Sequence, residues 1–190
     1  FYAIMGLYGA KYARYSFMIP QPAGSRKGYF MNILVSACLL GVSCRYDGGA
    51  NACPALLEAL RAGGHTAVPV CPEVYGGLPT PRPPAERQGC RVTTCTGADV
   101  TAAYQKGADT AVRLAALTGC TAAVLKANSP SCGAGTIYDG SFSHRKVAGD
   151  GVAAAALRDA GLAVYTEQDF APLFAPRPVH QTNMTEGETQ

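Results

Sequence analysis

The sequence contains no tryptophan, and only 15% of its 190 residues are charged. Disordered chains combine many charges with few apolar residues, so this composition excludes disorder as the state of the whole chain. Alanine and glycine are abundant instead. A chain of this length holds one domain with a substantial core and is short for two. We therefore expect one compact α/β domain.

Most of the chain also lacks an excess of basic charge. The first 30 residues hold four of the sixteen basic residues and no acidic residue, so the net charge of +3 arises there. The remaining 160 residues are close to neutral. A near-neutral body does not offer the basic surface with which proteins bind duplex nucleic acid. We expect a small molecule as the partner and no nucleic acid.

The start of the chain lacks the pattern of a secretory signal. No basic region precedes the aromatic-rich stretch over residues 1–17, and its longest uncharged run is ten residues, too short to cross a bilayer. We expect residues 1–30 to be an extension outside the fold, 31–174 to form the domain, and 175–190 to be a flexible tail. A membrane-surface or partner-binding helix and a docked arm are alternatives for 1–30. No membrane contact is expected for the domain, and a cytoplasmic location is predicted.

Short apolar runs alternate with helical patterns along the rest of the chain. Such runs without polar alternation are typical of parallel strands covered on both faces. The pattern predicts a single three-layer α/β domain of the Rossmann-like kind, with a mostly parallel sheet and helices on both faces. Strands are expected at 33–37, 66–70, 122–126 and 162–166, and helices at 54–62, 99–118 and 152–161, with a short helix within 167–174.

Three of the eight cysteines follow predicted strands. Cys38 and Cys71 come directly after a strand, and Cys132 lies in the loop after a third. Because the carboxyl ends of parallel strands meet at one edge of a sheet, these thiols are expected at one site. The carboxylate of Glu73 lies two positions after Cys71, whereas Cys120 precedes its strand and belongs at the opposite edge.

The cysteines form no CxxC pair, and no histidine adjoins these three. Both absences disfavour structural zinc, which prefers four closed ligands. Three thiolates suit a soft metal or an iron–sulfur cluster, and three cysteines on a four-iron cluster leave one iron open to substrate. Buried or redox-active thiols are an equally open interpretation of the spacing.

Four segments follow one another along the chain, "SACLLGVSCRYDGG", "PVCPEVYGGLPTPRPPAE", "LKANSPSCGAGTIYDG" and "GDGV". In the same order they resemble the successive motifs of a bacterial family, the thiouracil desulfidases, formerly labelled a domain of unknown function. The resemblance covers about residues 31–167. It implies a [4Fe–4S] cluster held by Cys38, Cys71 and Cys132, with Glu73 and Ser129 as catalytic residues.

The resemblance implies a non-redox hydrolysis of 4-thiouracil or a related thiolated base to uracil and hydrogen sulfide. The open iron would accept the sulfur, and Glu73 and Ser129 would hold the attacking water, with Glu73 as general base. The residues alone leave open that Glu73 only accepts backbone hydrogen bonds and that Ser129 only forms a turn. A tRNA-thiolating enzyme with the same cluster and a non-catalytic iron–sulfur or zinc redox sensor are the alternative functions.

Some features stay without an assignment. The sequence identifies no substrate-contacting residue and no oligomeric state. Cys44 lies one loop turn beyond Cys38, and its contribution to the site is open. The proline-rich segment 78–86 is expected to form a stiff strap over the site.

Overall fold

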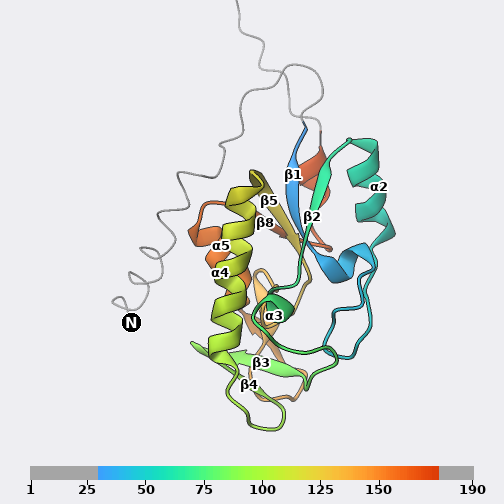
Figure 1. The fold of residues 1–190 in the computed structure, drawn as a ribbon. Helices are drawn as coiled ribbons and strands as arrows, with labels where there is room; N and C mark the ends of the chain where they lie inside the picture. Colours follow the sequence, from blue (N-terminus) through green and yellow to red (C-terminus); the bar gives the residue numbers. More distant parts are fainter. Residues whose placement is uncertain (1–29, 176–190) are drawn as a thin grey trace, which may run out of the picture.

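The computed structural model describes residues 30–175 (Figure 1). Apart from Phe30 and Ala175, the predicted extension and tail lie outside the described residues. Four parallel strands form the central sheet in the order β2-β1-β5-β8. Their bounds are β1 Asn32–Ser36, β2 Thr66–Val70, β5 Cys120–Leu125 and β8 Ala163–Thr166.

Apolar side chains on both faces of the sheet explain its three layers. Ile33 and Val35 of β1 lie in the cluster beneath α2 (Pro54–Ala62), whereas Leu34 packs in the cluster beneath α4 (Thr101–Leu117) and α5 (Val152–Asp159). All three side chains are fully buried. Figure 1 shows α2 on one side of the sheet and α4 and α5 on the other. The predicted three-layer α/β fold is confirmed, including a short 3-10 helix, η2 (Ala171–Phe174).

The elements that the sequence did not predict all follow strand carboxyl ends. Each has only three or four residues, too few for a helical period, and the hairpin strands carry polar residues that interrupt any apolar run. In Figure 1, α3 and the β3–β4 hairpin lie beyond the carboxyl ends of β1 and β2. The bounds are η1 Ala37–Leu40, α3 Pro72–Tyr75, the hairpin strands β3 Ala85–Gln88 and β4 Arg91–Thr94, and the hairpin strands β6 Thr136–Tyr138 and β7 Lys146–Ala148.

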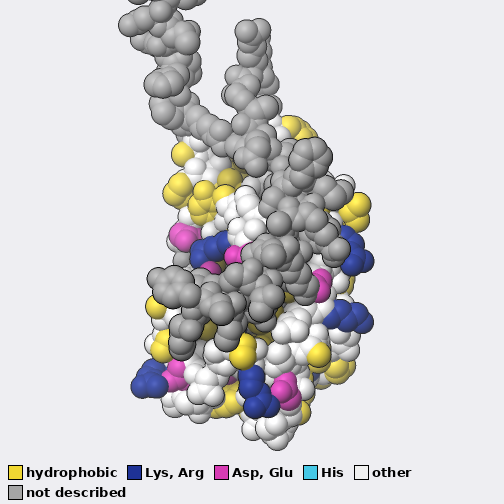
Figure 2. Space-filling view, turned by 90° about the vertical axis from the view of Figure 1, so that its left-hand side faces the viewer, with side chains coloured by type: hydrophobic (Ala, Val, Ile, Leu, Met, Phe, Trp, Pro, Cys, Tyr) yellow, Lys and Arg dark blue, Asp and Glu magenta, His cyan; other side chains and the backbone are white. Residues whose placement is uncertain are grey.

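Charges of both signs are mixed on the surface. Figure 2 shows basic and acidic side chains next to one another on the uncovered part of the side that carries α4 and α5. Exposed ion pairs account for some of this mixing, for example Arg158 with Asp150 at 2.7 Å. Among residues 30–175, no helix has the length and apolar character needed to cross a membrane.

Two glycines allow α3 to lie directly against the backbone of α4. A Cβ atom on Gly107 would stand 1.8 Å from the carbonyl oxygen of Pro72, and one on Gly76 would stand 2.1 Å from that of Ala103. Both distances are far inside van der Waals contact. The position of α3 therefore depends on the absence of a Cβ atom at Gly76 and Gly107. The positions of Cys71 and Glu73 depend on it in turn.

Replacing Gly107 by alanine is expected to lower the free energy of unfolding by about 1–3 kcal/mol, the usual range for overpacking. Alanine in a helix interior normally stabilises by about 1 kcal/mol relative to glycine, so the clash with Pro72 reverses the usual sign. Urea unfolding measures the effect. Lys106→Ala, on the exposed face of the same helix, is the control and should change little. A stabilised Gly107→Ala variant would contradict the packing described here.

Candidate active site

A cavity of about 560 Å³ lies at the carboxyl edge of the sheet. All five residues predicted from the sequence line it, namely Cys38, Cys71, Glu73, Ser129 and Cys132. Cys44 lines it too, and the exposed Cys95 reaches it from the end of β4. Cys120 is buried in the core at the opposite end of β5. Sorting the cysteines by strand ends therefore places the three predicted thiols at one cavity, as expected.

Backbone hydrogen bonds hold Cys38 at the end of β1. The chain turns into η1, and Gly41, with φ of 95°, closes the turn by donating its N–H to the Cys38 carbonyl. The N–H groups of Asn51 and Cys53 return from the far end of the loop to the carbonyls of Cys38 and Leu39, at 2.9 Å each. The loop after β1 is thus fastened at both ends around the buried thiol.

Cys71 and Glu73 owe their positions to the first turn of α3. Cys71 is the N-cap of this helix, and Pro72 follows as its first residue, where the missing N–H costs nothing. The Cys71 carbonyl accepts the N–H of Tyr75 at 2.9 Å. The Cys71 thiol faces the carbonyl oxygen of Cys44 at 3.7 Å. One helical turn therefore presents a thiol and a carboxylate to the same cavity.

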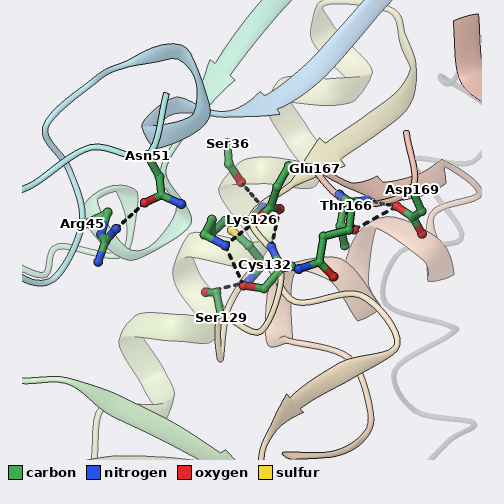
Figure 3. Close-up of polar contacts among 11 residues, drawn as sticks. Ser36, Arg45, Asn51, Lys126, Ser129, Cys132, Thr166, Glu167 and Asp169 are labelled. Carbon is green, nitrogen blue, oxygen red and sulfur yellow. Dashed lines mark hydrogen bonds and ion pairs between the residues drawn. The ribbon is translucent and has the colours of Figure 1, made fainter. Parts of the chain in front are cut away.

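The segment Ser129-Pro130-Ser131-Cys132 forms a tight turn beyond β5. The Ser129 hydroxyl oxygen accepts the backbone N–H groups of Ser131 and Cys132, both at 3.1 Å, and Figure 3 shows Ser129 beside Cys132. A serine hydroxyl has two acceptor positions and one hydrogen. Since both acceptor positions are used, this hydroxyl can act toward the cavity only as a donor.

Cys71 and Cys132 lie in a setting that favours the protonated form of their thiols when no metal is bound. Burial raises the pKa of the Cys132 thiol to about 12, and the hydroxyls of Ser36 and Ser131 act in the opposite direction. A hydrogen bond with the Cys44 thiol, followed by burial, raises the pKa of Cys71. Metal ligation by these cysteines would therefore release protons.

Arg82 is the site residue that the sequence analysis missed. It lies in the predicted strap, and its side chain is only 5% exposed. The Nε and one terminal nitrogen both donate to Oε2 of Glu73 at 2.7 Å. The guanidinium also donates to the carbonyls of Cys44 and Pro79 and to the Thr80 hydroxyl, at 3.0–3.1 Å. Arg82 thus ties the acid to both the strap and the loop after β1.

The buried hydroxyl of Tyr104 is a second group beside the acid. Burial first, and the Glu73 carboxylate second, raise the pKa of Tyr104. Tyr104 comes from α4 and is 1% exposed. Its phenol remains neutral at any physiological pH and adds a hydroxyl, rather than a charge, next to Glu73.

Removing the Arg82 side chain is expected to cost about 3–5 kcal/mol of stability, as breaking a buried ion pair usually does. Arg82→Ala leaves the Glu73 carboxylate, only 14% exposed, without its charged partner. Chemical denaturation measures the loss. Arg91→Ala breaks the exposed pair with Asp99 and is the matched control, with an expected cost far below that of Arg82→Ala because water screens exposed charges. Equal costs in the two variants would contradict this account.

A network beside the thiols joins three strand ends. Lys126, directly after β5, pairs with the Glu167 carboxylate, which also accepts the Ala127 N–H at 2.7 Å (Figure 3). The Lys126 backbone N–H donates to the Ser36 hydroxyl at 2.9 Å. Lys126 lines the cavity, as Arg82 does. The network fixes the ends of β1, β5 and β8 relative to one another.

Hydrogen bonds within the segment 45–49 stabilise its turn. Arg45 donates to Asn51 (Figure 3). Arg45 also donates to Asp47, which accepts the Gly49 N–H at 3.0 Å. With its hydrogen bonds directed to its own loop, this segment supports the strap and loop rather than presenting a carboxylate to the cavity.

The donor set fits an iron–sulfur cluster. Among residues 30–175, no three Cys, His, Asp or Glu side chains converge closely enough to ligate one metal ion. A cluster takes its cysteines on separate irons, so its ligands stand apart around a volume. The buried Ser131 hydroxyl, next to Cys132, has no hydrogen-bond partner within the described chain and can donate to sulfur.

A parallel α/β sheet that brings three soft thiols and a carboxylate to one cavity has the groups that a sulfur-ligated catalytic site needs. The chain belongs to the 2-thiouracil desulfurase family, whose model matches residues 33–169.

The chain is also similar to known proteins. The uncharacterized protein YbbK of Bacillus subtilis strain 168 is 42% identical over 148 residues, which cover 73% of this chain and 97% of YbbK. The solved structure of the [4Fe-4S]-dependent thiouracil desulfidase TudS is 49% identical, with a TM-score of 0.70. The match covers 76% of this chain and 95% of TudS.

Proposed function

We propose that this protein is a [4Fe–4S]-dependent desulfidase that hydrolyses thiouracil, or a related thiolated base, to uracil and hydrogen sulfide. The observation that carries the proposal is the meeting of three thiols, a paired carboxylate and a donor hydroxyl in one cavity. Membership of the 2-thiouracil desulfurase family and the likeness to TudS support it.

In this proposal Cys38, Cys71 and Cys132 hold the cluster. When bound, it supplies an iron without a protein ligand, a Lewis acid that attracts the thiocarbonyl sulfur and makes the ring carbon more electrophilic. Cys44 is not among the proposed ligands. Its backbone carbonyl oxygen accepts a hydrogen bond from the Arg82 guanidinium at 3.0 Å, so the Cys44 backbone helps to hold the acid.

Glu73 is the proposed general base. Its carboxylate takes a proton from water as the water oxygen bonds to the ring carbon, and the same proton is later delivered to the departing sulfur. Water therefore supplies the oxygen of uracil and both hydrogens of hydrogen sulfide, and no electron is gained or lost. Arg82 anchors Glu73 through Oε2, which keeps the carboxylate in one orientation during both transfers.

Ser129 is proposed to orient rather than to attack. Because its oxygen already accepts two backbone N–H groups, the hydroxyl donates its hydrogen to the water or to the substrate ring. A hydrogen bond of this kind restricts the reacting groups to a productive geometry and lowers the entropic part of the barrier.

Anaerobic purification with cluster reconstitution tests the function. We expect about four irons per chain and the formation of uracil and sulfide in equal amounts from 4-thiouracil. Iron without turnover would favour the redox-sensor alternative, and sulfur transfer to RNA without free sulfide would favour the thiolating enzyme. Either result would overturn the proposal.

A further inference from the structure

The cavity has an aromatic wall that the proposed chemistry does not use. Tyr138, at the end of β6, and Phe142 and His144, in the following loop, line the side formed by the β6–β7 hairpin. The rings of Tyr138 and His144 pack edge to face, with centroids 6.4 Å apart. The ammonium of Lys146 lies 5.7 Å from the centroid of the Tyr138 ring. All three rings line the same cavity as the thiols.

The loop that carries this wall has a strained backbone. Phe142 and His144 have φ of 57° and 62°, in the left-handed region that residues other than glycine rarely adopt. Such conformations persist only where surrounding contacts enforce them, and they concentrate at functional sites. Contacts within the loop contribute, since Asp139 accepts the Ser141 N–H at 3.0 Å and pairs with Arg145, and a contact from outside the loop adds to them.

Glu86 of the strap supplies the contact from outside the loop. Its side chain is buried, and Oε2 accepts the backbone N–H groups of Gly140 at 2.9 Å and Phe142 at 3.0 Å. Hydrogen bonds to a charged acceptor are stronger than neutral ones. Gly140, with φ of 90°, also leaves room for the Gln88 side chain, which a Cβ atom would meet at 2.8 Å. The strap thus holds the hairpin loop by hydrogen bonds at Gly140 and Phe142.

We propose that Glu86 is a positioning residue for substrate binding, which holds Tyr138, Phe142 and His144 as an aromatic wall for the ring of a thiolated base. A planar heteroaromatic ring packs well on an aromatic surface. The proposal rests on the proposed function for its substrate class. It assigns Glu86 to the binding of the ring, whereas Glu73 and the thiols act on the sulfur-bearing carbon.

The experiment compares Glu86→Ala with Glu86→Gln in the cluster-loaded protein. Alanine removes both acceptor contacts, whereas the glutamine amide oxygen can still accept two N–H groups. We expect Glu86→Ala to raise KM for 4-thiouracil about tenfold, with a much smaller change in kcat. Glu86→Gln should restore most of the loss. Glu58→Ala, on the exposed face of α2, is the matched control and should match the unaltered protein.

Limited trypsin digestion reports on the loop without any need for activity. Cleavage after Arg145 and Lys146 should become at least roughly tenfold faster in Glu86→Ala, because two strong hydrogen bonds that oppose loop opening are lost. Cleavage after Arg61 and Lys106, far from the hairpin in the chain, should not change. In the unaltered protein, 4-thiouracil should protect Arg145 and Lys146 from cleavage.

Each outcome decides the proposal. Faster cleavage with an unchanged KM would show that the loop is not a substrate wall, and no change in either would show that Glu86 does not hold it. If Glu86→Ala raises the cleavage rate at every site, the variant is unfolded as a whole and Phe142→Ala is measured instead. A raised KM in Phe142→Ala supports the wall, and an unchanged KM overturns it. If the unaltered protein lacks turnover, the proposed function fails, and protection by 4-thiouracil alone then supports or overturns the wall.

Discussion

Replacing Glu73 by glutamine is expected to lower kcat for 4-thiouracil by about 10²- to 10⁴-fold, the usual contribution of a positioned acid–base group. The amide matches the carboxylate in size but cannot take a proton from water. Because Cys38, Cys71 and Cys132 are untouched, the iron content should stay at its full value. Steady-state kinetics and iron analysis on one preparation measure both quantities.

The ion pair with Arg82 complicates this substitution, and the structure indicates how to separate the two effects. Glu73→Gln leaves the guanidinium with its three neutral acceptors, the carbonyls of Cys44 and Pro79 and the Thr80 hydroxyl. The variant should therefore stay folded with some loss of stability, which thermal unfolding reports. Glu58→Gln, on an exposed helix face, is the control. A kcat within threefold of the unaltered protein would remove Glu73 from the mechanism.

Cys38, Cys71 and Cys132 should each be indispensable for the cluster. Alanine at any one of them leaves two protein ligands, and we expect fewer than about one iron per chain after reconstitution. Cys44→Ala should keep about four irons, because in the proposed site Cys44 supports its neighbours without ligating iron. Iron and acid-labile sulfide assays, together with the visible absorption of the cluster, provide the readout.

Cys120→Ala is the matched control for this series. Cys120 is buried at the opposite end of β5, so the variant also removes a core thiol but should leave the iron content unchanged. If Cys44→Ala lost iron as completely as Cys132→Ala, the cluster would have four protein ligands. Four ligands favour electron transfer over substrate binding, and that result would contradict the proposed open iron.

Much of the fold followed from local patterns. The apolar runs of β1, β2, β5 and β8 and the helical periods of α4 and α5 were predicted within a few residues, because each element records its own burial in its sequence. The two hairpins were not predicted. Their strands have three or four residues, and the loop of the β6–β7 hairpin is held by Glu86, which lies far away in the chain, so no local pattern predicts it.

The residues around the acid were harder to predict than the acid itself. Charged side chains are seldom buried, so Arg82 and Glu86 read as the solvated residues of a proline-rich loop. Their partners lie up to 56 positions away, as with Glu86 and Phe142. The alternation of charged residues with prolines in the strap was the available signal, since a stiff segment can hold a buried charge in place at low entropic cost.

The sequence by itself determined which groups meet. Parallel strands run in one direction, so thiols and acids placed after their carboxyl ends arrive at one edge, and Cys38, Cys71, Glu73 and Cys132 do so here. Only the tertiary structure decided how these groups are held. Arg82 pairs with Glu73, and Glu86 accepts hydrogen bonds from the loop of the aromatic wall, only because distant segments pack together. The partner of a buried charge is therefore set by this packing and not by the spacing of residues in the chain.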